Sequence, residues 1–103
     1  MYKQVYEKGK VLRSAPLALR FYFPESMDKH RIGFIIRKKL GKAHVRNVFR
    51  RALRGVFQEA YPQFESDLWM VFEVYPAALT LSLSQFRSQA EQLVLQIKFP
   101  AKK

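Results

Sequence analysis

The stretch from Arg37 to Gln58, RKKLGKAHVRNVFRRALRGVFQ, constrains the fold more than any other part of the chain. It reads as the end of a strand, a basic turn around Gly41, and a helix from about Ala43 to Tyr61. Apolar residues recur there at spacings of three and four, which is typical of a helix that turns one face towards a core. The predicted apolar stripe comprises Val45, Val48, Phe49, Ala52, Leu53, Val56, Phe57 and Ala60.

A second face of the same predicted helix is basic. It consists of Arg46, Asn47, Arg50, Arg51 and Arg54, with three of the arginines four residues apart. Like charges at that spacing repel one another by roughly 0.2–0.5 kcal/mol per pair in an isolated helix. No carboxylate follows along the helix before Glu59. Because the guanidinium fork suits phosphate geometry, this face indicates an anionic partner.

The charge of the whole chain agrees with this interpretation. Nineteen Lys and Arg against eight Asp and Glu give a net charge of +11, and residues 29–58 contain ten basic residues and no acidic one. Such an excess points to nucleic acid or an anionic membrane surface. The absence of cysteine excludes disulfides and thiolate metal sites. With neither a signal-peptide pattern nor an apolar run of ~20 residues, we expect a cytoplasmic protein that does not enter a membrane.

The periodicity of the chain predicts one α+β domain over residues 1–103, with helices packed on a mainly antiparallel sheet. The expected elements are a short helix over residues 1–8, an extended piece over 10–14, strands over 17–23, 31–39 and 67–75, helices over 43–61 and 82–97, and a loose tail over 98–103. The 67–75 strand is apolar on both faces, which is typical of a central strand. Ser82 and Gln85 have capping-box spacing at the start of the last helix.

The residues reveal no catalytic constellation and no metal site. The eight carboxylates are scattered, G-x-S-x-G is absent, and His44 near the helix start is most simply an exposed helical histidine. Aromatic side chains can stack on unpaired bases, and the four candidates are Tyr2, Tyr6, Tyr22 and Trp69. Core filling competes with this role at each position, least at the two tyrosines of the first helix. The residues by themselves therefore predict a binding protein.

The segment GFIIRKKLGKAHVRNVFRRALRGVF resembles the signature of the bacterial ribonuclease P protein family, in which a strand, a lysine–glycine turn and an arginine-rich helix follow one another. The matching residues are Gly33, Lys38, Lys39, Leu40, Gly41, Ala43, Arg46, Asn47, Arg50, Arg51, Leu53 and Arg54. The segment from Tyr2 to Gly9 is similar to the family's first helix. Two positions depart from the pattern: Val48 replaces the second arginine of R-N-R, and Gly55 replaces a residue that is often acidic.

This resemblance implies an α-β-β-β-α-β-α fold with an unusual left-handed βαβ crossover. It also implies a protein subunit of ribonuclease P, which assists removal of the 5′ leader of precursor tRNA while the RNA subunit, with Mg²⁺, performs the phosphodiester hydrolysis. The implied partners are the ribonuclease P RNA, with one protein per RNA, and precursor tRNA. The implied contacts are Lys38, Lys39, Lys42, Arg46, Asn47, Arg50, Arg51 and Arg54 with the catalytic RNA, and Tyr2, Tyr6 and Tyr22 with the leader.

Two other interpretations of the basic helix stay open at this point. A small ribosomal protein, with a purely structural RNA-binding role, would be equally basic. A duplex-DNA binder could place the Arg46–Arg54 helix in a major groove.

Overall fold

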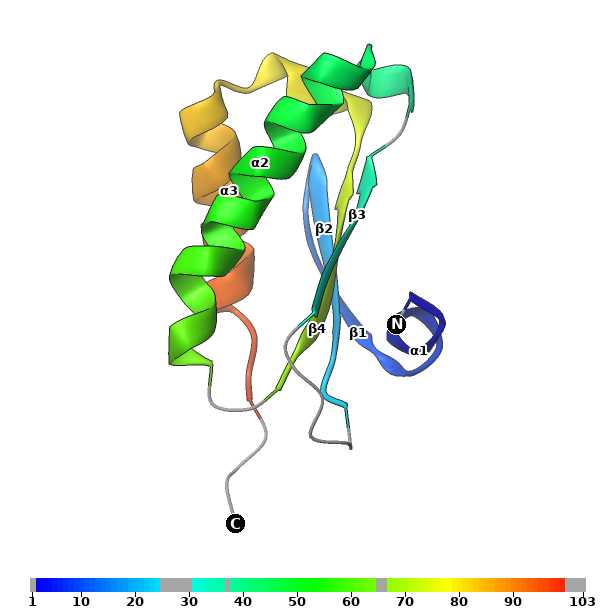
Figure 1. Cartoon of the computed structure of the whole chain (residues 1–103), viewed down its shortest axis with the longest axis vertical. Coiled ribbons are helices and arrows are strands. Elements are labelled where there is room, and N and C mark those ends of the chain that lie inside the picture. The colour runs from blue at the N-terminus through cyan, green and yellow to red at the C-terminus, as the bar shows by residue number, and fades with distance from the viewer. Residues whose placement is uncertain (1, 25–30, 37, 65–66, 100–103) are drawn as a thin grey trace.

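The computed structural model describes residues 2–24, 31–36, 38–64 and 67–99. In chain order, the helices and strands are α1 (Tyr2–Lys8), β1 (Lys10–Ser14), β2 (Leu17–Tyr22), β3 (Arg31–Ile36), α2 (Ala43–Ala60), β4 (Trp69–Val74) and α3 (Leu83–Leu95) (Figure 1). This is the predicted element order. Within the described part of the chain, none of the helices has the length and apolarity needed to cross a membrane.

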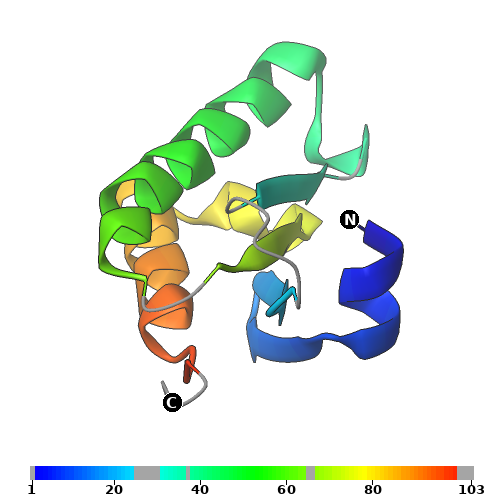
Figure 2. The ribbon, with the colours of Figure 1, turned by 60° about the horizontal axis from the view of Figure 1, so that its bottom comes forward.

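The four strands form one mixed sheet in the order β1-β2-β4-β3. β1 pairs with β2 and β2 with β4 in antiparallel fashion, whereas β3 and β4 run parallel. All six residues of β4 are buried, as its two apolar faces predicted. α2 links β3 to its parallel neighbour β4, and the views in Figures 1 and 2 show that this crossover is left-handed, the rare hand for a βαβ unit.

Helices cover both faces of the sheet: α2 and α3 lie on one side and α1 on the other (Figures 1 and 2). The main core lies under α2 and α3, where the Phe49 and Phe86 rings meet at 4.8 Å. α3 begins with the predicted capping box, in which Ser82 and Gln85 exchange hydrogen bonds. A smaller cluster of Val5, Trp69 and Val71 fills the space under α1.

Two sequence predictions near α2 were wrong. Val48 is 46% exposed and does not belong to the core, because the buried face centres on Phe49, Leu53 and Val56. At 3.6 residues per turn, Val48 lies about a quarter turn away from that centre. The strand predicted over 31–39 ends at Ile36, and residues 38–40 form a short 3₁₀ helix instead. Residue 37 lies outside the described residues.

The packed part of the chain extends further than the predicted start of the tail at residue 98. The Phe99 ring is half-buried and lies 5.5 Å from the Phe23 ring and 5.5 Å from the Phe64 ring. The rest of the predicted tail, 100–103, lies outside the described residues.

The junction between α1 and β1 requires glycine at position 9. A Cβ atom there would lie 2.4 Å from the carbonyl oxygens of both Val5 and Phe21. We therefore expect Gly9→Ala to destabilise the protein by about 1–3 kcal/mol, as overpacking does.

Gly55→Ala is the matched control: its Cβ would meet only the Arg87 guanidinium, at 3.4 Å. Because alanine is the better helix former, this control should gain up to about 1 kcal/mol. Urea denaturation of both variants measures the two effects, and a Gly9→Ala variant as stable as the wild type would contradict this account of Gly9.

Candidate nucleic-acid interface

The turn before α2 sets the direction of the basic helix. Leu40 is buried, and Gly41 has a φ of 125°, a backbone conformation that glycine adopts without a steric penalty. The carbonyl oxygen of Lys42 then accepts hydrogen bonds from the N–H groups of Val45 and Arg46, at 3.0 and 3.2 Å. The first turn of α2 contains no acidic residue. The positive end of the helix dipole is therefore left without a compensating carboxylate, which favours an anion at this end.

The predicted basic face exists as one surface of α2, with Asn47, Arg51 and Arg54 exposed and Arg46 and Arg50 half-buried. Arg50 Nη1 donates to Asn47 Oδ1 at 2.6 Å, which holds the guanidinium along the helix. Arg46 Nε is buried and has no hydrogen-bond acceptor within the described part of the chain. Arg50 is thus held in place along the helix, and the exposed Arg51 and Arg54 are open to an external acceptor.

Neither of the two ion pairs found among the described residues involves this face. They join Arg20 to Glu73 and Arg87 to Glu59. Lys39 and Lys42, which were also predicted to bind RNA, are exposed in the turn before α2 and so extend the same surface. The side chain of Lys38 lies outside what the structure describes. The positive charge of the basic face therefore has no acidic partner in the described part of the structure, as the sequence indicated.

A second surface lies on the opposite side of the sheet, around α1. The side chains of Tyr2 and Tyr6 are 43% and 39% exposed, whereas Val5 between them is buried against the sheet. The Tyr2 hydroxyl accepts a hydrogen bond of 3.2 Å from the backbone N–H of Phe34, on the outer edge of β3. The two tyrosines of α1 are therefore both exposed, while Val5 faces the sheet.

The other two aromatic candidates differ from this pair. Trp69 is only 8% exposed and belongs to the small core under α1, so it fills space there. Tyr22 is half-buried, with its ring 5.9 Å from that of Trp69. The Arg31 guanidinium lies 5.5 Å from the Trp69 ring. Tyr22 thus borders the α1 surface and is less open than Tyr2 and Tyr6.

A charged group that the sequence analysis did not identify lies next to Tyr6. Arg20 Nε donates to Glu73, and the Arg20 guanidinium carbon lies 4.4 Å from the centre of the Tyr6 ring. Glu73 is only 6% exposed, and its second carboxylate oxygen accepts a bond of 3.3 Å from the Tyr75 hydroxyl. Arg20 is therefore held between a buried carboxylate and an aromatic ring.

The contacts in this group shift the pKa of two side chains, Arg20 and Tyr6. The hydrogen bond with Glu73 raises the pKa of Arg20, so the guanidinium stays charged. Burial, and then the negative charge of Glu73, raise the pKa of the Tyr6 hydroxyl above its ordinary value, so Tyr6 is neutral at physiological pH. The surface at α1 consequently offers a neutral aromatic ring backed by a permanent cation.

Phe34 joins the two surfaces. Its backbone N–H bonds to Tyr2 on the α1 side, and its ring lies 5.8 Å from the Arg54 guanidinium on the α2 side. The edge strand β3 therefore lies between the basic face of α2 and the surface of α1 that carries Tyr2 and Tyr6, which we call the tyrosine face.

The described residues do not offer a site for the magnesium ion that the resemblance implies. No three His, Cys, Asp or Glu side chains gather in a group that could hold a metal, within the ranges that the structure covers. Mg²⁺ prefers carboxylate, phosphate and water oxygens. The donors present in the described part of the chain therefore do not fit the ion.

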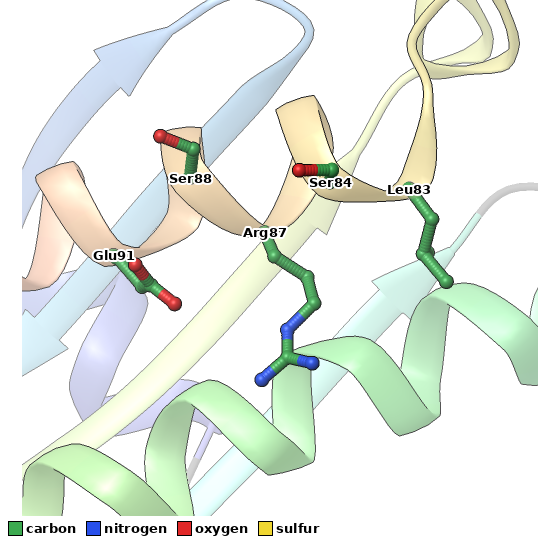
Figure 3. Close-up of a pocket in the computed structure, with 5 residues that line it drawn as sticks. All are labelled: Leu83, Ser84, Arg87, Ser88 and Glu91. Carbon is green, nitrogen blue, oxygen red and sulfur yellow. The ribbon is translucent and has the colours of Figure 1, made fainter.

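A hollow of about 460 Å³ lies along α3. Figure 3 shows its five lining residues, with Arg87 reaching from α3 towards α2. Arg87 Nη2 lies over Gly55 and donates to Glu59 at 3.3 Å, so it links the two helices. Two serines line the hollow, but no histidine does. The charged side chains that line the hollow are Arg87, which is bound to Glu59, and Glu91.

Comparison with known proteins identifies the family of the chain. A family model described as Ribonuclease P matches residues 1–98. The ribonuclease P protein component of Petrotoga mobilis is 30% identical over 101 residues, covering 94% of this chain and 85% of that protein. That of Syntrophomonas wolfei is 38% identical over 65 residues, which cover 63% of this chain and 54% of that protein.

The fold also matches a solved structure. The RNase P protein from Thermotoga maritima superposes with a TM-score of 0.81 at 20% sequence identity, covering 95% of this chain and 92% of that one. At this identity, the structural similarity concerns the fold, and the family rests on the sequence matches.

Proposed function

The chain belongs to the ribonuclease P protein family, and from this we propose that it is the protein subunit of a ribonucleoprotein ribonuclease P. In this role it binds the catalytic RNA and the 5′ leader of precursor tRNA, and it assists the endonucleolytic cut that forms the mature 5′ end. The observation that carries the proposal is the basic face of α2, whose cations have no acidic partner among the described residues. Phosphate oxygens of a folded RNA would supply that partner.

In this proposal the protein positions the precursor tRNA on the catalytic RNA, and the RNA catalyses the cleavage. The surface residues Lys38, Lys39, Lys42, Arg46, Asn47, Arg50, Arg51 and Arg54 dock on the ribonuclease P RNA, one protein per RNA. The RNA, whose phosphates suit a hard cation, holds the Mg²⁺ that the ribonucleoprotein requires. The protein contributes no catalytic residue. We place this assembly in the cytoplasm, with its precursor tRNA substrates.

The tyrosine face of α1 would hold the leader. Tyr2 and Tyr6 offer exposed rings, Tyr22 borders them, and Arg20 beneath Tyr6 adds a fixed positive charge. Such a combination of aromatic rings and a cation suits single-stranded RNA, because unpaired bases stack on the rings and the phosphates are attracted to the positive charge. Since β3 borders both surfaces, the leader and the catalytic RNA would be bound side by side.

Tyr6→Ala is expected to weaken binding of leader-bearing precursor to the holoenzyme by about 1–3 kcal/mol, the usual effect of losing one stacked base. Mature tRNA lacks the leader, so its affinity should not change. Tyr6→Phe keeps the ring and serves as the control. Equilibrium binding of both tRNA forms measures the difference, and equal losses for the two forms would exclude a leader role for Tyr6.

Reconstitution tests the proposed function itself. The protein alone should leave precursor tRNA intact, and the cognate RNA alone should cut slowly at low magnesium. Adding the protein should restore accurate cleavage at that magnesium concentration, because its cations reduce the repulsion between the RNA and its substrate. If the cleavage rate stays the same with and without the protein, the proposal is wrong.

A further inference from the structure

A groove lies where α2 approaches the beginning of β3, beyond the last arginine of the basic face. It encloses about 630 Å³ and is lined by Ile32, Arg54, Phe57, Gln58 and Tyr61. Only Arg54 among these residues was predicted to contact RNA. The groove is distinct from the α1 surface, because α1 and α2 lie on opposite faces of the sheet (Figure 2).

The groove continues the basic face along the same side of the helix. Gln58 follows Arg54 by four residues, the spacing that separates Arg46, Arg50 and Arg54. Tyr61 follows Arg54 by seven, about two helical turns. Its backbone N–H still bonds to the Phe57 carbonyl, so the helical path is kept at this point. An RNA strand that lies along the arginines therefore reaches these side chains next.

The chemistry changes along this path from charge to aromatic surface. The rings of Phe57 and Tyr61 are stacked, with centroids 5.6 Å apart and planes at 20°. Phe57 is also packed edge-on against Phe64 at 6.2 Å, which anchors the pair to the protein. The Tyr61 side chain is 43% exposed, so part of its surface is open to a ligand. Gln58 is exposed and carries both hydrogen-bond donors and acceptors.

We propose that this groove binds one unpaired nucleotide of the same RNA that contacts the basic face. The base would lie against Tyr61, its edge would hydrogen-bond with the Gln58 amide, and its phosphate would meet Arg54. Aromatic stacking combined with a side-chain amide is how proteins recognise splayed-out RNA bases. The inference rests on the proposed RNA-binding role of α2 and adds a base-reading site to it.

The test compares the affinity for cognate ribonuclease P RNA, over a series of salt concentrations, of the wild type and three variants. Tyr61→Leu should weaken binding about five- to 150-fold, the range for loss of one stacked base, and leave the salt dependence unchanged because no charge is removed. Tyr61→Phe keeps the ring and should bind within about twofold of the wild type. Arg46→Ala should instead reduce the salt dependence.

The outcomes separate the inference from the proposed function. If Arg46→Ala weakens binding and Tyr61→Leu does not, the nucleotide groove is excluded and the RNA-binding role stands. If neither variant changes the affinity, the proposed RNA-binding role fails, and the groove fails with it. A reduced salt dependence for Tyr61→Leu would also overturn the inference, since it would mean that the basic face itself had been disturbed.

Ultraviolet crosslinking of the protein–RNA complex provides an independent measurement. We expect mass spectrometry to find a nucleotide attached to the Gln58–Tyr61 segment, and the crosslinked position in the RNA to be unpaired. A crosslink to a base-paired position, or none in this segment while the basic face crosslinks, would overturn the inference.

Discussion

Replacing Arg46 and Arg50 together by alanine is expected to weaken binding of the ribonuclease P RNA by about 1.5–3 kcal/mol for each arginine. Arg50 is held by Asn47, and neither Arg46 nor Arg50 has an ion-pair partner among the described residues, so both guanidinium groups keep an uncompensated charge for an external anion. The phosphate contacts that these two guanidinium groups make would be lost in the variant. The fold should be retained, because neither side chain belongs to the core.

The salt dependence of this binding identifies the contact. Each phosphate contact that is removed should lower the slope of log affinity against log salt by nearly one unit, so the double variant should lose about two. Arg13→Ala is the matched control, because Arg13 is an exposed arginine on β1, at the other edge of the sheet. If Arg13→Ala lowers the slope by as much per arginine as the double variant does, the charge of the whole chain, and not the basic face, determines binding.

Leu53→Ala is expected to lower the free energy of unfolding by about 2–5 kcal/mol. Leu53 is fully buried in the main core beneath α2, so its loss leaves a cavity. Val48→Ala removes an apolar side chain from the same helix at an exposed position and should change the free energy by no more than about 0.5 kcal/mol. Urea denaturation compares the two variants. A large loss for Val48→Ala would mean that the valine is packed, contrary to the structure.

The sequence predicted α2 well because two patterns overlap there. The spacing of the apolar residues predicted which side of the helix faces the core, and the spacing of the arginines predicted which side is basic. It misassigned Val48 because a helical wheel does not show how wide the buried face is. That width depends on where α3 and the sheet contact α2, and those contacts come from residues distant in the sequence. Val48 therefore lies on the surface where the family carries a second arginine.

The contact between Arg20 and Glu73 could not be predicted from the sequence. Arg20 and Glu73 are 53 residues apart and become neighbours only through the pairing of β2 with β4, in which Arg20 lies opposite Val71. One signal was present, since each residue places a charge in an otherwise apolar strand, on the side that alternation assigns away from the main core. The pairing register was needed to turn that signal into a contact. The left-handed crossover was likewise expected from the family resemblance and not from any spacing.

Sequencing of the RNA that co-purifies with the protein tests the central claim most directly, because the basic face of α2 is proposed to bind one particular folded RNA. The wild type should carry ribonuclease P RNA as its main bound species, and the Arg46→Ala/Arg50→Ala variant should lose it while Arg13→Ala retains it. Recovery of ribosomal RNA as the main species, or of the same RNA in equal amounts with the double variant, would contradict the account.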